Sequence, residues 1–204
     1  MKIRNIEIEL HQAGEALSDH IRRENDFYEA EILDYIALNF PVHQVILDIG
    51  ANIGNHSLYF ANFLKYHKIV AYEPIPRNYY LLIQNLARYK NVEISTFALS
   101  DREEKVPMFE FPPNMGASGY NKDGPLMVSG YPLDAFHHKD VTFMKIDVEN
   151  FEEQVLAGAK ETINRNKPLI LIEDGYNKYA ELLPQYECIA SWSGYKTFLY
   201  RWKE

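Results

Sequence analysis

The chain has 204 residues, of which 47% are hydrophobic and 25% are charged, and this composition excludes a disordered or a fibrous protein. At this length folding removes roughly 70% of the unfolded chain's surface from water, so a core can form without disulfides or a structural metal. Lys and Arg number 21 against 29 Asp and Glu, which gives a formal net charge of −8. This balance argues against a nucleic-acid partner and favours a small-molecule or glycan ligand.

The single cysteine and the first residues indicate where the protein works. One cysteine, Cys188, cannot form an internal disulfide framework, which favours a reducing compartment. The first seven residues carry charges where a signal peptide would have its apolar run, and no later stretch reaches the roughly 20 apolar residues of a membrane span. We expect a cytoplasmic protein with no membrane partner, and we expect Cys188 to be an inert thiol in the core.

Between residues 45 and 173, short β-branched runs alternate with helical patterns, which predicts a parallel sheet with crossover helices. The expected strands are Val45–Ile49, Ile69–Glu73, Val92–Phe97, Val141–Ile146 and Leu169–Glu173. Helical spacing is found at 58–64 and 80–87, and a short helix is expected at 179–183. Runs at 187–191 and 195–202 predict a closing antiparallel pair. The order predicts a doubly wound, Rossmann-like α/β fold with a mostly parallel seven-stranded sheet and an antiparallel C-terminal edge.

Two segments lie outside this alternation. Residues 1–43 contain a helical pattern at 29–40, which we expect to lie across the edge of the sheet as an N-terminal helical cap. Residues 112–130 are rich in Gly and Pro and predict a long irregular loop, which would act as a lid over an acceptor. The chain is treated as one domain, with the cap at 1–43 and a catalytic core at 44–204.

The strongest functional signal is D-I-G-A-N-I-G at residues 48–54, where the first core strand ends and a helix begins. Glycines let a ligand approach the backbone, and a helix N-terminus offers unpaired amide donors. Glu73 ends the second strand, where doubly wound folds place an acid that accepts hydrogen bonds from both ribose hydroxyls of an adenosine cofactor. The loop and the acid together predict an adenosine-cofactor site.

Charge near the loop indicates which adenosine cofactor binds. Nicotinamide cofactors use G-x-G-x-x-G, whereas this loop is G-x-N-x-G and follows Asp48, where a carboxylate would repel a pyrophosphate. S-adenosylmethionine has no phosphate. Its sulfonium and ammonium groups favour a nearby carboxylate, and its own carboxylate can use the loop amides and Asn52. The loop therefore predicts a methyl-donor site.

Several motifs carry a resemblance to a known family. They are D-I-G-A-N-I-G at 48–54, Y-E-P at 72–74, A-L-S-D at 98–101, L-D at 133–134, F-M-K-I-D-V-E at 143–149 and Q-V-L-A-G-A at 154–159. With these motifs in this order, residues 45–175 resemble the FkbM family of S-adenosylmethionine-dependent O-methyltransferases, which implies a class I methyltransferase fold. One departure is Asn150, where the family has glycine. Asn tolerates a left-handed conformation, so we expect the turn to be kept.

The resemblance also implies which residues bind the donor. The loop would line the amino-acid end, Glu73 would hold the ribose, and the pair at 98–99 would flank the adenine. F-Y-E at 27–29 resembles a segment that precedes the first strand in this family and would close over the donor. The expected cofactor-binding residues are Phe27, Tyr28, Glu29, Asp48, Gly50, Asn52, Gly54, Asn55, His56, Ser57, Glu73, Pro74, Ala98, Leu99 and Asp147.

Acids also end the last two parallel strands. Asp147 and Glu149 follow the fourth strand, and Glu173 and Asp174 end the fifth. Ligands in open parallel sheets sit beyond the carboxyl ends of the strands, so these groups are expected where the methyl group meets the acceptor. Methyl transfer to an alcohol requires removal of the hydroxyl proton by a base or with help from a metal. The catalytic candidates are Asp147, Glu149 and Glu173.

Two interpretations of these acids remain open. Crowded carboxylates repel one another unless one is protonated or a cation is present. An Asp followed by a Glu-Asp pair at the next strand end resembles the magnesium site of certain sugar O-methyltransferases that modify antibiotics, so Mg²⁺ bound by Asp147, Glu173 and Asp174 is one prediction. A metal-free carboxylate base is the other, and Glu149 and Asp174 could instead cap the following helices. His56 is a further candidate base, although it is more simply placed beside the donor.

The leading functional hypothesis is methyl transfer to a sugar hydroxyl, such as that of a deoxyhexose, in a glycan or a glycosylated metabolite. Tyr120 and Tyr131 flank the expected lid and could stack on the sugar. The alternatives are a methyltransferase for a non-sugar small molecule or for nucleic acid, and a non-catalytic binding domain. Base-amino methyltransferases commonly carry D/N-P-P-Y/F/W after the fourth strand, where this chain has D-V-E-N at 147–150. The chain is expected to be a module of a larger glycan-building enzyme or to act as a homodimer.

Overall fold

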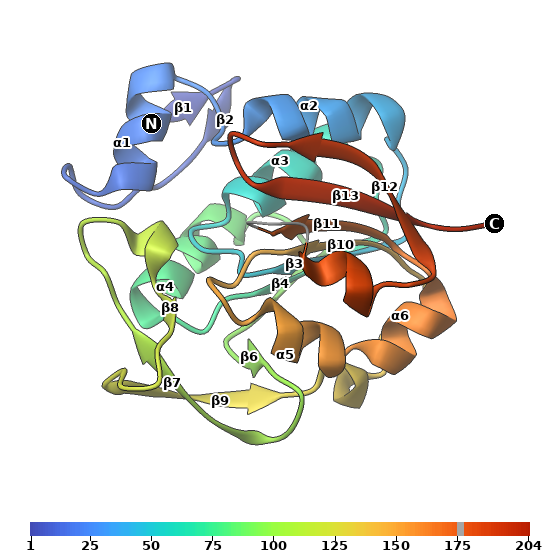
Figure 1. Ribbon diagram of the computed structural model, residues 1–204. Helices are drawn as coiled ribbons and strands as arrows, with labels where there is room; N and C mark the ends of the chain where they lie inside the picture. Colours follow the sequence, from blue (N-terminus) through green and yellow to red (C-terminus); the bar gives the residue numbers. More distant parts are fainter. Residues whose placement is uncertain (175–177) are drawn as a thin grey trace.

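A computed structural model describes residues 1–174 and 178–204. In these residues a seven-stranded sheet runs through the centre (Figure 1), in the order β12 (Tyr186–Trp192), β13 (Thr197–Trp202), β11 (Leu169–Glu173), β10 (Val141–Ile146), β3 (Val45–Ile49), β4 (Lys68–Tyr72) and β5 (Val92–Ser95). Neighbours from β11 to β5 are parallel, and β13 pairs antiparallel with β11 and β12. The prediction of an α/β fold with a large, mostly parallel sheet is confirmed.

Helices cover both faces of this sheet (Figure 1). The first face carries α2 (Ala30–Asn39), α3 (Asn55–Phe63) and α4 (Pro76–Leu86), and the second carries α5 (Glu152–Ala157) and α6 (Lys160–Asn166). Successive side chains of a strand point to opposite faces, so β3 contributes Ile46 to the first core and Leu47 to the second. Burial on both faces explains the continuous apolar runs of the central strands. Within the described residues, no helix combines the length and apolarity that crossing a membrane requires.

The N-terminal segment packs on one face of the sheet and extends toward its antiparallel edge. A hairpin of β1 (Lys2–Ile3) and β2 (Ile6–Glu7) precedes α1 (Ala16–Glu24), and α2 follows. Ile32 and Ile36 of α2 are fully buried in the same cluster as Phe143 of the central strand β10. At the antiparallel edge of the sheet, Tyr35 of α2 contacts Trp192 of β12 with 5.2 Å between ring centres, so α2 reaches the expected edge as well as the central strands.

The segment 112–130 is not the irregular loop that its Gly and Pro content suggested. It contains the 3-10 turn η1 (Met115–Ala117), and two of its strands join a second sheet in the order β6 (Ala98–Leu99), β9 (Leu126–Tyr131), β7 (Glu104–Phe109) and β8 (Gly119–Tyr120). Val106, Met108 and Val128 point to one side of this sheet and are buried with Phe151. That short alternation between apolar and polar residues outweighs the glycines and prolines.

The structure differs from the sequence predictions in two smaller respects, the helix near residue 179 and the position of Cys188. The helix expected at 179–183 is the 3-10 helix η3 (Lys178–Leu182), and a further 3-10 turn, η2 (Leu133–Phe136), precedes β10. Cys188 is exposed, so the prediction of a core thiol is wrong. Its strand, β12, forms the edge of the sheet, where outward side chains face solvent.

Candidate active site

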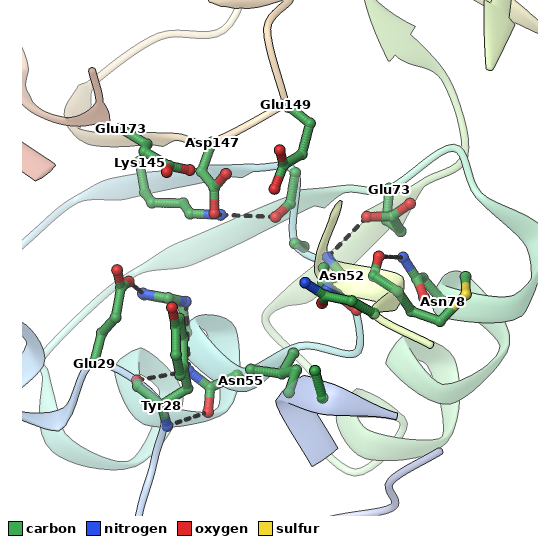
Figure 2. Close-up of a pocket in the computed structure, with 18 of the residues that line it drawn as sticks. Tyr28, Glu29, Asn52, Asn55, Glu73, Asn78, Lys145, Asp147, Glu149 and Glu173 are labelled. Carbon is green, nitrogen blue, oxygen red and sulfur yellow. Dashed lines mark hydrogen bonds and ion pairs between the residues drawn. The ribbon is translucent and has the colours of Figure 1, made fainter. Parts of the chain in front are cut away.

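A cavity of about 340 Å³ opens where four neighbouring parallel strands end. Gly50 follows β3, Glu73 follows β4, Asp147 follows β10 and Glu173 ends β11, and all four line the cavity (Figure 2). This is the place where open α/β sheets bind their ligands. The order of the strands in the sheet thus brings together residues that are as far apart in the sequence as Gly50 and Glu173.

The glycine loop passes very close to the strand that carries Asp147. Gly50 has φ +79°, and a Cβ on it would lie 1.7 Å from the backbone oxygen of Asp147. Asn52 also has a positive φ, 52°, and its side-chain Oδ1 is buried with no hydrogen-bond partner in the described part of the chain. A buried acceptor without a partner is costly unless a ligand satisfies it. The loop therefore fits a ligand that brings a donor, such as an ammonium group.

Glu73 is held by backbone amides at the wall of the cavity. Its Oε2 accepts from the amide of Asn52 at 2.8 Å (Figure 2). Its Oε1 accepts from the amide of Ile75 at 2.8 Å. Burial raises the pKa of Glu73 to about 7, against these hydrogen bonds and the charge of Lys145. The carboxylate is thus fixed in orientation and titrates near neutral pH. Its role toward a ribose stays a prediction.

A narrow apolar slot of about 40 Å³ adjoins the other side of Glu73. Pro74, Ala98 and Leu99, three of the expected donor-binding residues, line it. The opposite wall includes Met108 of β7 and Phe151, so the second sheet completes the slot. An apolar slot next to a buried, oriented carboxylate has the shape and polarity that suit a flat heteroaromatic ring.

Lys145 lies under the cavity and was not singled out from the sequence. Its ammonium donates to the Gly50 carbonyl at 2.7 Å and lies 3.3 Å from Asp147 Oδ2 and 3.6 Å from Asp48 Oδ1. Burial lowers the pKa of Lys145, but the two carboxylates outweigh it and raise the pKa above its ordinary value. Lys145 is therefore a permanent cation that ties the glycine loop to the end of β10. In the parallel pairing of β10 with β3, Lys145 lies beside Asp48. A lysine and an acid near the ends of two neighbouring strands are the sequence signal that could have identified Lys145.

Three carboxyl groups meet on one side of the cavity (Figure 2). Asp147, Glu149 and Glu173 each have an oxygen within 4.8 Å of the others. A hydrogen bond joins Asp147 and Glu173. Burial opposes the ionisation of Asp147, but Lys145 and this bond keep its pKa below the ordinary value, whereas burial and the charge of Asp147 raise the pKa of Glu173. The shared proton therefore resides on Glu173. We refer to these three residues as the carboxylate cluster.

Glu149 is the member of the cluster suited to titrate at neutral pH. Burial and the charge of Asp147 raise the pKa of Glu149 to about 7. Glu149 and Asn150 both have positive φ, 55° and 71°, so the expected left-handed turn is kept with Asn in place of glycine. That turn directs the Glu149 side chain to the cavity instead of capping the next helix.

Asp174 does not join the cluster, which corrects the predicted magnesium ligands. It is 1% exposed, and its two carboxylate oxygens accept from the amides of Lys178 and Tyr179 at 2.9 Å. It therefore serves the start of η3. The three ligands predicted from the sequence are not brought together, and the group that does come together contains Glu149 in place of Asp174.

The expected F-Y-E segment contributes two of its three residues. Glu29 Oε2 lies 2.9 Å from Nε2 of His56, and both side chains are nearly buried. Asn55 accepts from the amide of Tyr28 and donates to its carbonyl, each at 3.0 Å (Figure 2). These four residues line the cavity and join the N-terminal segment to the start of α3. His56 is engaged by Glu29, which places it in the wall.

The other expected cofactor-binding residues lie behind the wall, which is a second correction. Phe27 packs edge-on against Tyr59, and Ser57 donates to Asp48 at 2.6 Å where both are fully buried. Gly54 faces the side chain of Leu82 on α4. The residues Phe27, Asp48, Gly54 and Ser57 thus shape the loop from behind, because consecutive positions of a strand or helix cannot all face one cavity.

The roof of the cavity comes from two segments that sequence reasoning did not assign to the donor. Ala16, Leu17 and His20 of α1 and residues 114–116 around η1 line it. Glu15 joins them: its carboxylate accepts from the amides of Leu17 and Ser18 in α1 and of Met115 in η1, the last at 2.9 Å. Part of the expected acceptor lid therefore borders the donor loop. The acidic N-cap Glu15 is visible in the sequence only as a weak local signal, which does not reveal its contact with Met115.

Comparison with known proteins identifies the class. Residues 48–196 match the model of the methyltransferase FkbM domain, so the chain belongs to this family and is a methyltransferase. The match covers the glycine loop, Glu73, the slot and the carboxylate cluster.

Individual relatives agree with this assignment. The chain is 23% identical over 181 residues to 2-O-methyltransferase NoeI of Sinorhizobium fredii, covering 72% of this chain and 73% of that protein. It is 37% identical over 81 residues to methyltransferase sdnD of Sordaria araneosa, but this match covers 38% of this chain and 31% of sdnD. A match to AMB antimetabolite synthetase AmbE of Pseudomonas aeruginosa, 34% identical over 43% of this chain, spans only 4% of that protein.

Solved structures share the fold. Methyltransferase FkbM from Methylobacillus flagellatus superposes with a TM-score of 0.60 at 22% identity, over 78% of this chain and 44% of that one. A methyltransferase from Geobacter sulfurreducens gives a TM-score of 0.52 at 15% identity, over 92% of this chain and 86% of that one. Methyltransferases with this fold take the methyl group from S-adenosylmethionine.

Proposed function

We propose that this protein transfers a methyl group from S-adenosylmethionine to a hydroxyl of a sugar. The observation that carries the proposal is the carboxylate cluster, which borders the same cavity as the glycine loop and Glu73. Sulfonium and hydroxyl can therefore meet beside groups able to take up a proton. The relative NoeI is named a 2-O-methyltransferase, which supports oxygen as the acceptor atom.

The donor half of the cavity, defined as the glycine loop, Glu73 and the apolar slot, fits this cofactor. The slot would take the adenine, and the oriented carboxylate of Glu73 would accept from the ribose hydroxyls. The unpartnered Asn52 Oδ1 would accept from the ammonium group. When bound, the donor supplies a methyl group on a positively charged sulfur, which a neutral oxygen can attack.

The acceptor half, defined as the carboxylate cluster with the facing wall of Tyr28 and Tyr195, would deprotonate the hydroxyl. Glu149 is the proposed general base, because a base with a pKa of about 7 is ionised at physiological pH and still binds a proton well. Asp147 stays ionised beside Lys145 and stabilises positive charge at the reaction centre. Glu173, protonated, donates to Asp147 and holds it in place.

This arrangement favours the metal-free alternative over Mg²⁺. Lys145 already provides a cation 3.3 Å from Asp147, and the proton on Glu173 removes a second charge from the cluster. The carboxylate oxygens of the three residues would nevertheless suit Mg²⁺ as ligands, so the requirement for metal is tested directly.

The test is a transfer assay with methyl-labelled donor against a panel of methyl glycosides, with EDTA in one arm and Mg²⁺ in the other. We expect label on a sugar hydroxyl in both arms. Transfer that vanishes with EDTA and returns with Mg²⁺ would overturn the metal-free base. Donor binding measured by calorimetry, together with no label on any sugar, would overturn the sugar as acceptor. Absence of donor binding would overturn the donor assignment.

A further inference from the structure

Three aromatic rings from distant parts of the chain form one wall of the cavity. The rings of His20 on α1 and Tyr28 lie 5.2 Å apart, and those of Tyr28 and Tyr195 lie 5.8 Å apart, both edge to face. All three line the cavity and are half-buried. Figure 2 shows Tyr28 across the cavity from the carboxylate cluster. A ring-shaped ligand between the two walls would meet aromatic rings on one side and carboxyl groups on the other.

The sequence had pointed to other rings. Tyr120 stacks on Phe151 at 4.6 Å, and Tyr131 packs against Phe97 at 4.9 Å, so neither ring lines the cavity. Tyr195, in the turn between β12 and β13, carries no motif and could not be singled out. Only the fold brings this turn beside Tyr28.

Acidic side chains outnumber basic ones around the cavity. Five acidic side chains line it: Glu29, Glu73, Asp147, Glu149 and Glu173. Among the described residues that line it, Lys145 is the only Lys or Arg, and its ammonium is already engaged by Gly50 and Asp147. Residues 175–177, outside the described part, include no Lys or Arg in the sequence. No Arg or Lys is therefore left among the described lining residues to bind a phosphate.

A phosphate next to this cluster would be repelled by ionised Asp147 and, above about pH 7, by ionised Glu149. Phosphate recognition in proteins relies on Arg, Lys or a row of free backbone amides. Here two of the amides near the cavity already donate to Glu73, and the ammonium of Lys145 is already engaged by Gly50 and Asp147. Repulsion between like charges in a partly buried cavity is weakly screened by salt. An uncharged sugar, or one that carries an amino group, meets no such penalty.

We propose that the acceptor is a sugar without phosphate, stacked on Tyr28 and Tyr195 with its reacting hydroxyl toward the carboxylate cluster, and that sugar phosphates and nucleotide-linked sugars are rejected. This inference rests on the proposed function. It also gives the enzyme a place in a reaction sequence. The reaction that supplies its acceptor is a glycosyl transfer, which releases the nucleoside diphosphate and leaves the sugar in glycosidic linkage before methylation.

The first test compares matched acceptors built on whichever sugar the transfer assay identifies. The methyl glycoside, its amino analogue, the sugar 1-phosphate and the nucleoside-diphosphate sugar are each offered to the whole protein. We expect kcat/KM for the methyl glycoside to exceed that for both phosphorylated forms by roughly a hundredfold or more. Equal or better transfer to a phosphorylated form overturns this inference and leaves the proposed function standing. No transfer to any form of any sugar overturns both.

The second test addresses the aromatic wall. Tyr195→Ala should raise the acceptor KM by roughly tenfold, because the stacking surface is lost, while the donor Kd is unchanged. Tyr195→Phe keeps the ring and should restore KM to within about twofold. Tyr80→Ala is the matched control, since Tyr80 is 63% exposed on α4 and outside this cavity. An unchanged KM in a folded Tyr195→Ala protein, verified by its melting curve, overturns the stacking role.

The third test isolates charge from catalysis by measuring binding alone. With the demethylated donor present, calorimetry compares the sugar phosphate and the methyl glycoside on wild type and on Glu149→Gln. Removing one carboxylate should strengthen phosphate binding by several-fold and change glycoside binding little. If the phosphorylated sugar gains nothing, the carboxylate cluster is not what excludes it, and the proposal is wrong.

Discussion

The donor half of the cavity is held together mainly by backbone contacts, and the acceptor half mainly by side-chain contacts. In the donor half the decisive contacts are backbone ones: Gly50 touches the backbone of Asp147, and the amides of Asn52 and Ile75 hold Glu73. In the acceptor half they are side-chain contacts among the carboxylate cluster, Lys145 and the aromatic rings. Changes in the donor half should therefore act through backbone geometry, and changes in the acceptor half through charge and ring surface.

The largest expected effect is that of Gly50→Ala. The Cβ of the alanine would lie 1.7 Å from the backbone oxygen of Asp147, so the loop and the end of β10 would have to separate. The alanine would also have to adopt the φ of +79° that Gly50 has, which is strained for a residue with a side chain. We expect destabilisation of about 4 kcal/mol or more and loss of measurable donor binding. Calorimetry and thermal melting check this.

Gly14→Ala is the matched control for Gly50→Ala. Gly14 has φ +96° but nothing within 4 Å of its would-be Cβ, so only backbone strain of about 1–2 kcal/mol is expected. If Gly50→Ala is no worse than Gly14→Ala, the close crossing of loop and strand does not matter, and the donor half is less dependent on backbone geometry than we argue.

The next effect is that of Glu149→Gln, which removes the proposed base. We expect kcat to fall by about a hundredfold or more, with the donor Kd unchanged. Because the folded state raises the pKa of Glu149 to about 7, ionised Glu149 destabilises the fold, increasingly as pH rises from its ordinary value toward 7. Glu149→Gln should therefore melt at the same temperature or higher at pH 8.

Glu153→Gln on α5 is the control for this variant, since Glu153 is exposed and lies outside the cavity. Wild-type kcat in Glu149→Gln would show that another group removes the proton. A lower melting temperature at pH 8 would show that Glu149 is a stabilising structural acid and not a repelled member of the cluster.

A third effect should appear in the pH dependence of donor-half binding. Burial raises the pKa of Glu73 to about 7, and only the ionised form can accept from both ribose hydroxyls. Affinity for 5′-methylthioadenosine, which has the ribose but no amino-acid group, should rise with pH up to about 7 and level off above about pH 8. Glu73→Gln should bind roughly tenfold more weakly at pH 8 and lose this dependence.

The sign is opposite for the stability of the free protein. Folded Glu73 keeps its proton up to about pH 7, whereas the unfolded chain releases it near the ordinary pKa, so stability falls as pH rises through this interval. Calorimetry with 5′-methylthioadenosine and thermal melting between pH 5 and 8 measure both trends. Affinity that does not change across pH 6–8 would mean that Glu73 is already ionised or does not hold the ribose.

The sequence predicted the donor half of the cavity better than the acceptor half. The donor half is encoded locally: residues 48–54 and Glu73 are short motifs at the ends of strands, and Val45–Ile49 was located to the residue. The carboxylate cluster was only partly predictable. Asp147 and Glu173 followed from strand ends, but whether Glu149 or Asp174 completes the group depends on the turn at 149–150 and on the amides of η3.

The aromatic wall and the roof could not be predicted, for a physical reason. Tyr195 and Met115 join the cavity through contacts that reach across about a hundred residues or more, as between Glu15 and Met115. Periodicity and motif spacing report local structure only. Lys145 is an intermediate case, since it stood within a recognised motif but its pairing with Asp48 required the register of two parallel strands.

The smallest expected effect is that of Glu15→Ala. In the native protein Glu15 joins α1 to η1, the two segments of the roof. The variant loses the cap of α1 and leaves the Met115 amide without its partner. The cap alone is worth about 1 kcal/mol, so the donor Kd should rise only about three- to fivefold.

Glu24→Ala, at the exposed far end of α1, is the control and should leave the donor Kd unchanged. Glu15 joins the first turn of α1 to η1, whereas His20, which contacts Tyr28 of the acceptor wall, lies further along α1. The acceptor KM should therefore change less than the donor Kd. A lower melting temperature with an unaltered donor Kd would reduce Glu15 to a helix cap. A larger change in acceptor KM than in donor Kd would move the roof to the acceptor half, where segment 112–130 was first expected to act.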